Sequence, residues 1–269
     1  MNPFPDTPGT PFGDTLLCEN NTNTLYTIDS AANATSYTWQ LDPDTAGVLS
    51  PSDTSVVIDW SDTWTGYADL SVQANGDCGS TAFPPSLQIH LRPFPEQPDM
   101  PSGPTPLCQG SANTSYTTNQ APNAMSYSWD LAPAEAGTIS GTDTIGTISW
   151  SSSFTGTASV KVKSINDCNE SSWSDSINIL VNSNPVVNLG EDTSITYIQP
   201  LILDAGNPGA DYLWSTGDTT QIIDASYTGS PVLTYWVEVT ASSCLGSDTI
   251  PDAYHPESQQ RRLCSGYHI

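Results

Sequence analysis

The segment Ser36–Pro43, with the sequence SYTWQLDP, returns 90 residues later as SYSWDLAP at 126–133. In both copies Tyr, Trp and Leu alternate with other residues, and a period of two is the pattern of a β-strand that buries one face. Residues 11–95 and 101–185 align without a gap and share 34 identities in 85 positions. Because 90 residues is the size of a whole small domain, the sequence predicts a tandem duplication of one β-domain.

A third stretch, residues 185–250, follows the repeat less closely but alternates in the same way, as at Tyr212 and Trp214. Short alternating runs separated by turn clusters every 8 to 12 residues are typical of antiparallel sandwiches. We therefore expect an all-β chain of three tandem antiparallel β-sandwich domains, at 1–94, 95–184 and 185–250. Residues 251–269 lose the alternation and are predicted to be a non-repeat tail, truncated or disordered.

The joint between the first two domains, Pro93–Pro101, holds four prolines. Proline cannot donate a hydrogen bond to a sheet and favours extended chain, so this joint is predicted to be a semi-rigid spacer.

The charge balance excludes several classes of protein. The chain has 5 Lys and Arg against 29 Asp and Glu, a formal net charge of -24. So few basic residues cannot neutralise the phosphates of a nucleic acid or of an anionic membrane surface. No apolar run approaches the roughly 18 to 20 residues that cross a bilayer, so no membrane insertion is expected.

Six cysteines in an acidic β-rich chain indicate an oxidising compartment. Cys18 and Cys78 are 60 residues apart, and so are their equivalents Cys108 and Cys168. This spacing favours one disulfide inside each repeat, with buried free thiols as the alternative; a zinc site would need a CxxC or paired His that the sequence lacks. Cys244 and Cys264 have no repeat partner and could either pair or stay free.

Calcium is the one metal for which the sequence offers candidates, because loop carboxylates are its usual ligands. The candidate calcium ligands are Asp204, Asp211 and Asp218. Other acidic groups occur at Asp42 with Asp44 and at Glu191-Asp192. No stretch has the spacing of a calcium-binding loop, so solvated carboxylates are the competing interpretation. No other cofactor is expected.

Catalytic motifs are missing: the sequence has no nucleophile elbow, phosphate-binding loop or His-Glu-x-x-His, and His90 is expected on a strand surface. No catalytic residue is therefore assigned. Trp39, Trp129 and Trp214 occupy equivalent strand positions and are expected in the cores, whereas Trp236 is out of phase with Tyr235 and Val237 and should face outward as a possible ligand-facing aromatic.

The chain resembles the PKD-like, immunoglobulin-like modules found in tandem in large secreted and surface proteins of bacteria. The resemblance rests, in the first copy, on Leu17-Cys18, Ser36–Gly47, Trp60–Gly66 and Asp77–Gly79; in the second copy, on Leu107–Gly110, Trp129, Ala136-Gly137, Trp150–Gly156 and Asp167-Cys168; and, in the third unit, on Val187–Asp192, Leu203–Gly217 and Tyr235–Thr240. In the related short modules an early Cys usually precedes the late one; this chain has Ser194-Ile195-Thr196 there, which implies that Cys244 has lost its usual partner.

The resemblance implies a non-catalytic spacer or adhesion array, extracellular or on the cell surface, whose partners are other domains of the same polypeptide. Two alternatives stay open. One is a carbohydrate-binding set, which would require Trp64, Trp173 and Trp236 to form one exposed strip that binds surface polysaccharide. The other is a filament of like subunits in which residues 1–10 of one chain add a strand to an open sheet edge of the third unit in the next.

Overall fold

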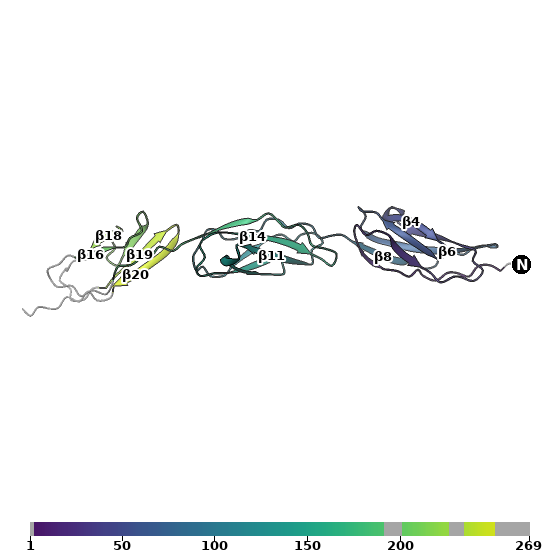
Figure 1. Ribbon diagram of the computed structural model, residues 1–269, viewed down its shortest axis with the longest axis horizontal. Helices are drawn as coiled ribbons and strands as arrows, with labels where there is room; N and C mark the ends of the chain where they lie inside the picture. Colours follow the sequence, from purple (N-terminus) through teal and green to yellow (C-terminus); the bar gives the residue numbers. More distant parts are fainter. Residues whose placement is uncertain (1–2, 191–200, 226–233, 251–269) are drawn as a thin grey trace, which may run out of the picture.

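The computed structural model describes residues 3–190, 201–225 and 234–250, and these fold into three successive β-units that follow one another along the molecule (Figure 1). We call them modules 1, 2 and 3. Each module has its own hydrophobic core, and the only helical elements among the described residues are two short 3-10 turns, Asp44–Ala46 and Ala134–Ala136. The predicted all-β class and tandem arrangement are confirmed.

Module 1 is a sandwich of two sheets. One sheet has the order β1-β8-β6-β3, with the short β7 also paired to β6, and the other has the order β2-β5-β4. The strands are β1 (Leu16–Cys18), β2 (Thr24–Thr27), β3 (Ser36–Asp42), β4 (Gly47–Ser52), β5 (Ser55–Trp60), β6 (Gly66–Gly76), β7 (Gly79–Ser80) and β8 (Leu87–Arg92).

Module 2 repeats this plan, as the 90-residue offset predicts, with sheets β11-β14-β15-β9 and β10-β13-β12. Its strands are β9 (Leu107–Cys108), β10 (Thr114–Thr117), β11 (Ser126–Ala132), β12 (Gly137–Ser140), β13 (Ile145–Trp150), β14 (Gly156–Ile165) and β15 (Ile177–Asn182).

Module 3 is smaller and pairs its described strands in sheets β16-β18 and β17-β19-β20. These strands are β16 (Ile202–Asp204), β17 (Asp211–Trp214), β18 (Ile222–Asp224), β19 (Tyr235–Ala241) and β20 (Cys244–Ile250).

The repeated Trp residues lie in the cores, as expected. Trp39, Trp129 and Trp214 are 8%, 9% and 1% exposed. A buried indole N–H needs an acceptor. Trp39 and Trp129 donate to the carbonyl oxygens of Asp53 and Asp143, 14 residues further on in each case, and Trp214 donates to that of Thr220. The alternation that defines these strands thus reports which face packs between the sheets.

The spacer interpretation of Pro93–Pro101 is wrong, because this segment belongs to module 2. Pro95, Pro98 and Pro101 are buried, and the Glu96 N–H donates to the Pro122 carbonyl at 3.0 Å. Three-residue spacing is the repeat of a polyproline helix, so one face of the segment can pack while its backbone stays extended. Little chain is left over to act as a linker.

Residues 3–10 pack onto module 1 in the same way, so the described part of this segment is not an unattached donor strand. Pro5 and Pro8 are buried, and the Asp6 N–H donates to the Ala32 carbonyl at 2.9 Å. Pro3-Phe4-Pro5 is the counterpart of Pro93-Phe94-Pro95. The repeat therefore begins before residue 11.

One parallel pairing in each sandwich positions the features described next. β1 runs parallel to β8 with Cys18 opposite Arg92, and β9 runs parallel to β15 with Cys108 opposite Asn182. The first strand of each module runs beside its last strand and in the same direction. The cysteine at the end of the first strand therefore lies at the end of the module from which the chain continues into the next module.

Candidate functional site at the module junctions

The disulfides cross from one module to the next. Cys18 bonds to Cys168 and Cys108 bonds to Cys244, each with a Cα–Cα distance of 5.5 Å. The predicted pairings Cys18 with Cys78 and Cys108 with Cys168 are therefore wrong. Cys244 has its partner in module 2, although the family resemblance implied that its partner was lost, and Cys264 lies outside the described residues.

Strand length explains why a bridge inside module 1 is impossible. Gly66, at the start of β6, pairs with Leu91 next to the Cys18 end of the sheet, whereas Cys78 follows Gly76 at the other end of β6. Ten residues of strand, at about 3.3 Å each, span about 33 Å. A disulfide needs Cα atoms within about 7 Å, so the two cysteines of one module lie at opposite ends and cannot meet.

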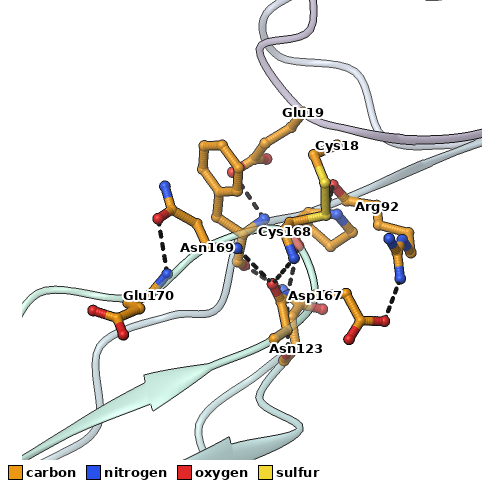
Figure 2. Close-up of a disulfide and its surroundings, with 11 residues drawn as sticks. Cys18, Glu19, Arg92, Asn123, Asp167, Cys168, Asn169 and Glu170 are labelled. Atoms are coloured by element: carbon orange, nitrogen blue, oxygen red, sulfur yellow. Dashed lines mark hydrogen bonds and ion pairs between the residues drawn. A yellow bond between two sulfur atoms is a disulfide. The ribbon is translucent and has the colours of Figure 1, made fainter.

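The first junction combines the disulfide with an ion pair and a hydrogen bond (Figure 2). Arg92 Nη1 lies 2.8 Å from Asp167 Oδ2, across the boundary between modules. The backbone N–H of Phe94 donates to Glu19 Oε1 at 3.0 Å, which ties the connecting chain back to module 1. Because Asp167 is adjacent to Cys168, and Arg92 is opposite Cys18, the ion pair and the disulfide hold the same two chain ends together.

The loop that carries Cys168 is organised by the side chain of Asn166. Its Oδ1 accepts hydrogen bonds from the backbone N–H groups of Cys168 and Asn169 at 2.8 and 3.1 Å. Its Nδ2 donates to the carbonyls of Pro93 and Asn123 at 2.9 and 3.0 Å. One side chain thus fixes the loop and attaches it to the connecting segment, which helps to hold Cys168 at the junction.

The second junction uses the same plan with uncharged groups. The turn Ser242-Ser243, with positive φ at both residues, joins β19 to β20 and presents Cys244. Asn182 Nδ2 donates to the Ser242 carbonyl at 3.2 Å, and Asn184 Nδ2 donates to the Gln109 carbonyl at 3.1 Å. Asn182 occupies the place of Arg92, so an amide hydrogen bond replaces the ion pair of the first junction.

The chain segment that enters module 3 packs against β20, the strand that carries Cys244. The Pro185 carbonyl lies 2.2 Å from the place where a Cβ on Gly246 would be, a separation that real Cβ atoms do not show. Only glycine therefore fits opposite Pro185. The N–H of Leu189 donates to Asp248 Oδ2 at 2.8 Å, so the chain that enters module 3 lies along β20, the strand that begins at Cys244.

The calcium candidates are not gathered into one site. Among the described residues no group of three or more His, Cys, Asp or Glu could hold a metal ion. Asp204 accepts hydrogen bonds from the Gln221 side chain and the Gly206 N–H. These bonds, the first more than the second, hold the pKa of its carboxyl below the usual value. Asp218 accepts from the Thr216 hydroxyl, and Asp211 is exposed at the start of β17.

The aromatic candidates lie in different modules and form no common strip. Trp64 stacks on Trp60 in module 1 with ring centroids 6.4 Å apart, and the half-buried Trp173 of module 2 lies beneath the ammonium groups of Lys161 and Lys163. Trp236, in β19 of module 3, is 38% exposed and faces outward as expected. The strip of three Trp residues expected for a carbohydrate-binding set is therefore not present, and Trp236 would have to bind a sugar without the other two.

His90 is on the strand surface, as expected, where its ring stacks on Tyr67 with centroids 4.1 Å apart. Tyr67 is 60% exposed, so the pair lies on the outer face of the sheet rather than in a cleft.

None of the described helical segments is long and apolar enough to cross a membrane.

The first two modules match a known protein family. A model of the PKD-like domain matches residues 4–89 and again 94–179, and no curated protein matches the chain. Among solved structures, an ICAM-5 D1–D4 ectodomain fragment is 15% identical, with TM-score 0.45, over 90% of this chain and 73% of that one. The FN1–FN3 domains of chicken CNTN1 are 16% identical, with TM-score 0.29, over 92% and 99%. The D00–D0 domain of intimin is 12% identical, with TM-score 0.35, over 65% and 98%.

The two family matches begin 90 residues apart, at residues 4 and 94, where Pro-Phe-Pro opens each of the first two modules. Together they span well over half of the chain, and they coincide with two sandwiches of the same strand order. The protein therefore belongs to the PKD-like domain family, with two such domains in tandem.

Proposed function

We propose that the chain is a non-catalytic spacer array, part of a larger secreted or cell-surface protein, in which disulfides between neighbouring modules fix the reach of the array. One observation carries the proposal: both junctions are crossed by a disulfide, at Cys18–Cys168 and Cys108–Cys244. A binding or catalytic role for a single module does not need such bridges, whereas a defined separation between the two ends does.

The short connections support the same role. β8 ends at Arg92, and Pro95 is already buried in module 2. With so little chain between them, two modules joined at a second covalent point lose most of their freedom to rotate. Relative motion is the default expectation for domains joined by a small interface, so the bridge is the element that changes the behaviour of the array.

The setting outside the cell rests on the same bonds, because disulfides persist in oxidising compartments and are rare in the cytosol. A net charge of -24 also suits an exposed spacer. Neighbouring acidic modules repel one another over about 8 Å at physiological salt, which opposes folding back and self-association.

Small-angle scattering tests this proposal on the full chain. We expect the oxidised protein to give one narrow distribution of elongated shapes, and Cys18→Ser with Cys168→Ser to give a broader distribution with a shorter mean length. Cys108→Ser with Cys244→Ser is the matched variant at the second junction. Identical scattering from all three proteins would mean that the bridges do not set the reach, and the proposal would be abandoned.

Polysaccharide binding is the second candidate, and one observation favours it. Trp236 lies on the outer face of the β17-β19-β20 sheet, and Leu213, which is 46% exposed, pairs with Glu238 two residues further along β19. A flat exposed indole is a surface on which a sugar ring can stack. Isothermal titration of the wild type and of Trp236→Ala with soluble polysaccharides tests this candidate.

A further inference from the structure

Module 2 binds module 1 through residues at one of its ends. Module 1 has the counterparts of these residues at its own end that lies away from Cys18. At an offset of 90 residues, Asp77-Cys78 corresponds to Asp167-Cys168, the pair that contacts Arg92 and Cys18 at the first junction. The other correspondences at this end are Phe4 with Phe94 and Asn33 with Asn123.

The structure places these residues as it places their counterparts. β6 and β7 form a hairpin in which Gly76 pairs with Gly79, so Asp77 and Cys78 occupy its two-residue turn, and both are exposed. Asn33 has φ 61 and Asn123 has φ 60, so the neighbouring turn has the same left-handed residue. This end of module 1 therefore presents an exposed Asp-Cys pair in the position where module 2 binds a partner.

One difference concerns the residue that supports the loop. Module 1 has Gly76 where module 2 has Asn166, and a Cβ on Gly76 would lie 2.8 Å from the Asn33 carbonyl oxygen and 3.1 Å from Pro5. The Asn166 side chain bridges the loop to Asn123 in module 2, whereas in module 1 the loop backbone approaches Asn33 directly. The support is made in a different way, but the Asp-Cys pair that it carries is the same.

We propose that this surface is a docking site for a further PKD-like module of the same polypeptide and that Cys78 forms a disulfide with it. The partner is defined by the groups that module 1 presents at the first junction: a Cys at the end of its first strand, as at Cys18, and an Arg opposite it, as at Arg92. The Arg binds Asp77 as Arg92 binds Asp167. This inference rests on the proposed role as a disulfide-linked array and names what the array binds at this end.

The bond-forming step requires an oxidant. The thiols of Cys78 and of the incoming Cys lose two protons and two electrons as the S–S bond forms, and a disulfide oxidant such as oxidised glutathione takes them up and becomes two thiols.

The test is an extended chain in which a copy of residues 1–92 is placed directly before residue 3. Because Pro3-Phe4-Pro5 repeats Pro93-Phe94-Pro95, this fusion recreates the sequence of the first junction. The protein is refolded with reduced and oxidised glutathione and digested without reduction, and its linked peptides are identified by mass spectrometry. The added copy carries Cys78→Ser throughout, so that every Cys78 peptide comes from the original module 1. The control also carries Cys18→Ser in the added copy.

We expect a peptide that links Cys18 of the added copy to Cys78 of the original module 1, and its loss in the control. The result is scored only for preparations in which the Cys18–Cys168 and Cys108–Cys244 links are complete, which shows that the rest of the array has folded. If Cys78 in those preparations is a thiol or is bonded elsewhere, the inference is wrong. The proposed function would survive that result, because its test uses the 269-residue chain and its two existing bridges.

Discussion

Cys18 and Cys168 are 150 residues apart in the sequence and belong to different modules, yet their Cα atoms lie 5.5 Å apart in a disulfide. Closing a loop of 150 residues stabilises the folded state by about 5 kcal/mol in the chain-entropy model. The loop contains most of module 1 and more than half of module 2, so the stabilisation is shared between the two.

Cys18→Ser is expected to lower the melting temperatures of modules 1 and 2 together and to separate their unfolding into two transitions, because each module then unfolds without constraining the other. Calorimetry of the oxidised proteins measures this. Cys78→Ser is the matched control, since Cys78 takes part in neither junction bridge, and it should leave the coupled unfolding of modules 1 and 2 as in the wild type. An equal loss of stability in the two variants would contradict the pairing.

Trp129→Ala is expected to destabilise module 2 by about 3 to 5 kcal/mol, because it removes a buried indole and leaves a cavity. Trp236→Ala should cost little, because its side chain is 38% exposed. Denaturant unfolding followed by circular dichroism measures both effects. The result would be surprising if Trp236→Ala were the more damaging change.

The same Trp236→Ala protein separates a spacer from a polysaccharide binder. We expect isothermal titration of the wild type with soluble polysaccharides to give no heat of binding. Binding that is present in the wild type and lost in the variant would support the second candidate function instead.

Alkaline pH should weaken all three modules, because each has a tyrosine whose pKa is raised by burial: Tyr26, Tyr116 and Tyr235. A raised pKa means that, as the pH rises, the tyrosine ionises in the unfolded state before it does so in the folded state. Its contribution to the free energy of unfolding is therefore fully present below the ordinary pKa of 10 and is lost as the pH rises above it. In Tyr26→Phe the melting temperature of module 1 should be lower at pH 7, through loss of the hydrogen bond to the Asp14 carbonyl, but less dependent on pH between 9 and about 11. An unchanged pH dependence would exclude Tyr26 as the cause.

Calcium and ionic-strength-matched sodium are expected to raise the melting temperature by equal amounts. Both screen the repulsion of a chain with net charge -24, and no carboxylate cluster that could hold a metal is found in the described part of the chain. A larger shift with calcium, abolished by Asp204→Asn, would reveal a specific site.

The fold could be predicted from the sequence because strand alternation and the 90-residue offset report directly on which residues face the core. Trp39 and Trp129 are buried and Trp236 is exposed, each as its position in the alternation requires. The proline-rich joint could not be interpreted in this way, because proline is compatible both with a free spacer and with an edge segment. Only the burial of Pro95 and Pro98 distinguishes them.

The pairing of the cysteines could not be predicted from their spacing alone, for a physical reason. The two cysteines of each repeat are equally spaced in the sequence whether the disulfides lie inside modules or join consecutive modules. The distinguishing signal is Cys244, because its unit has no early cysteine and a bridge to the preceding unit would give it a partner. Combined with the length of β6, which separates Cys78 from the Cys18 end by about 33 Å, that signal would have favoured the correct pairing.

The staggered bridges also separate in time the synthesis of the two cysteines that form each bond. At about 5 to 20 residues per second, Cys168 is made roughly 8 to 30 s after Cys18, and Cys78 is made long before it. In that interval Cys78 is the nearest available partner in the sequence, and the folding of module 1 carries it to the opposite end of the sandwich. Folding of module 1 in this interval therefore favours the native bridge over a Cys18–Cys78 bond, and the native bridge closes where the folded module 2 brings Cys168 to the junction.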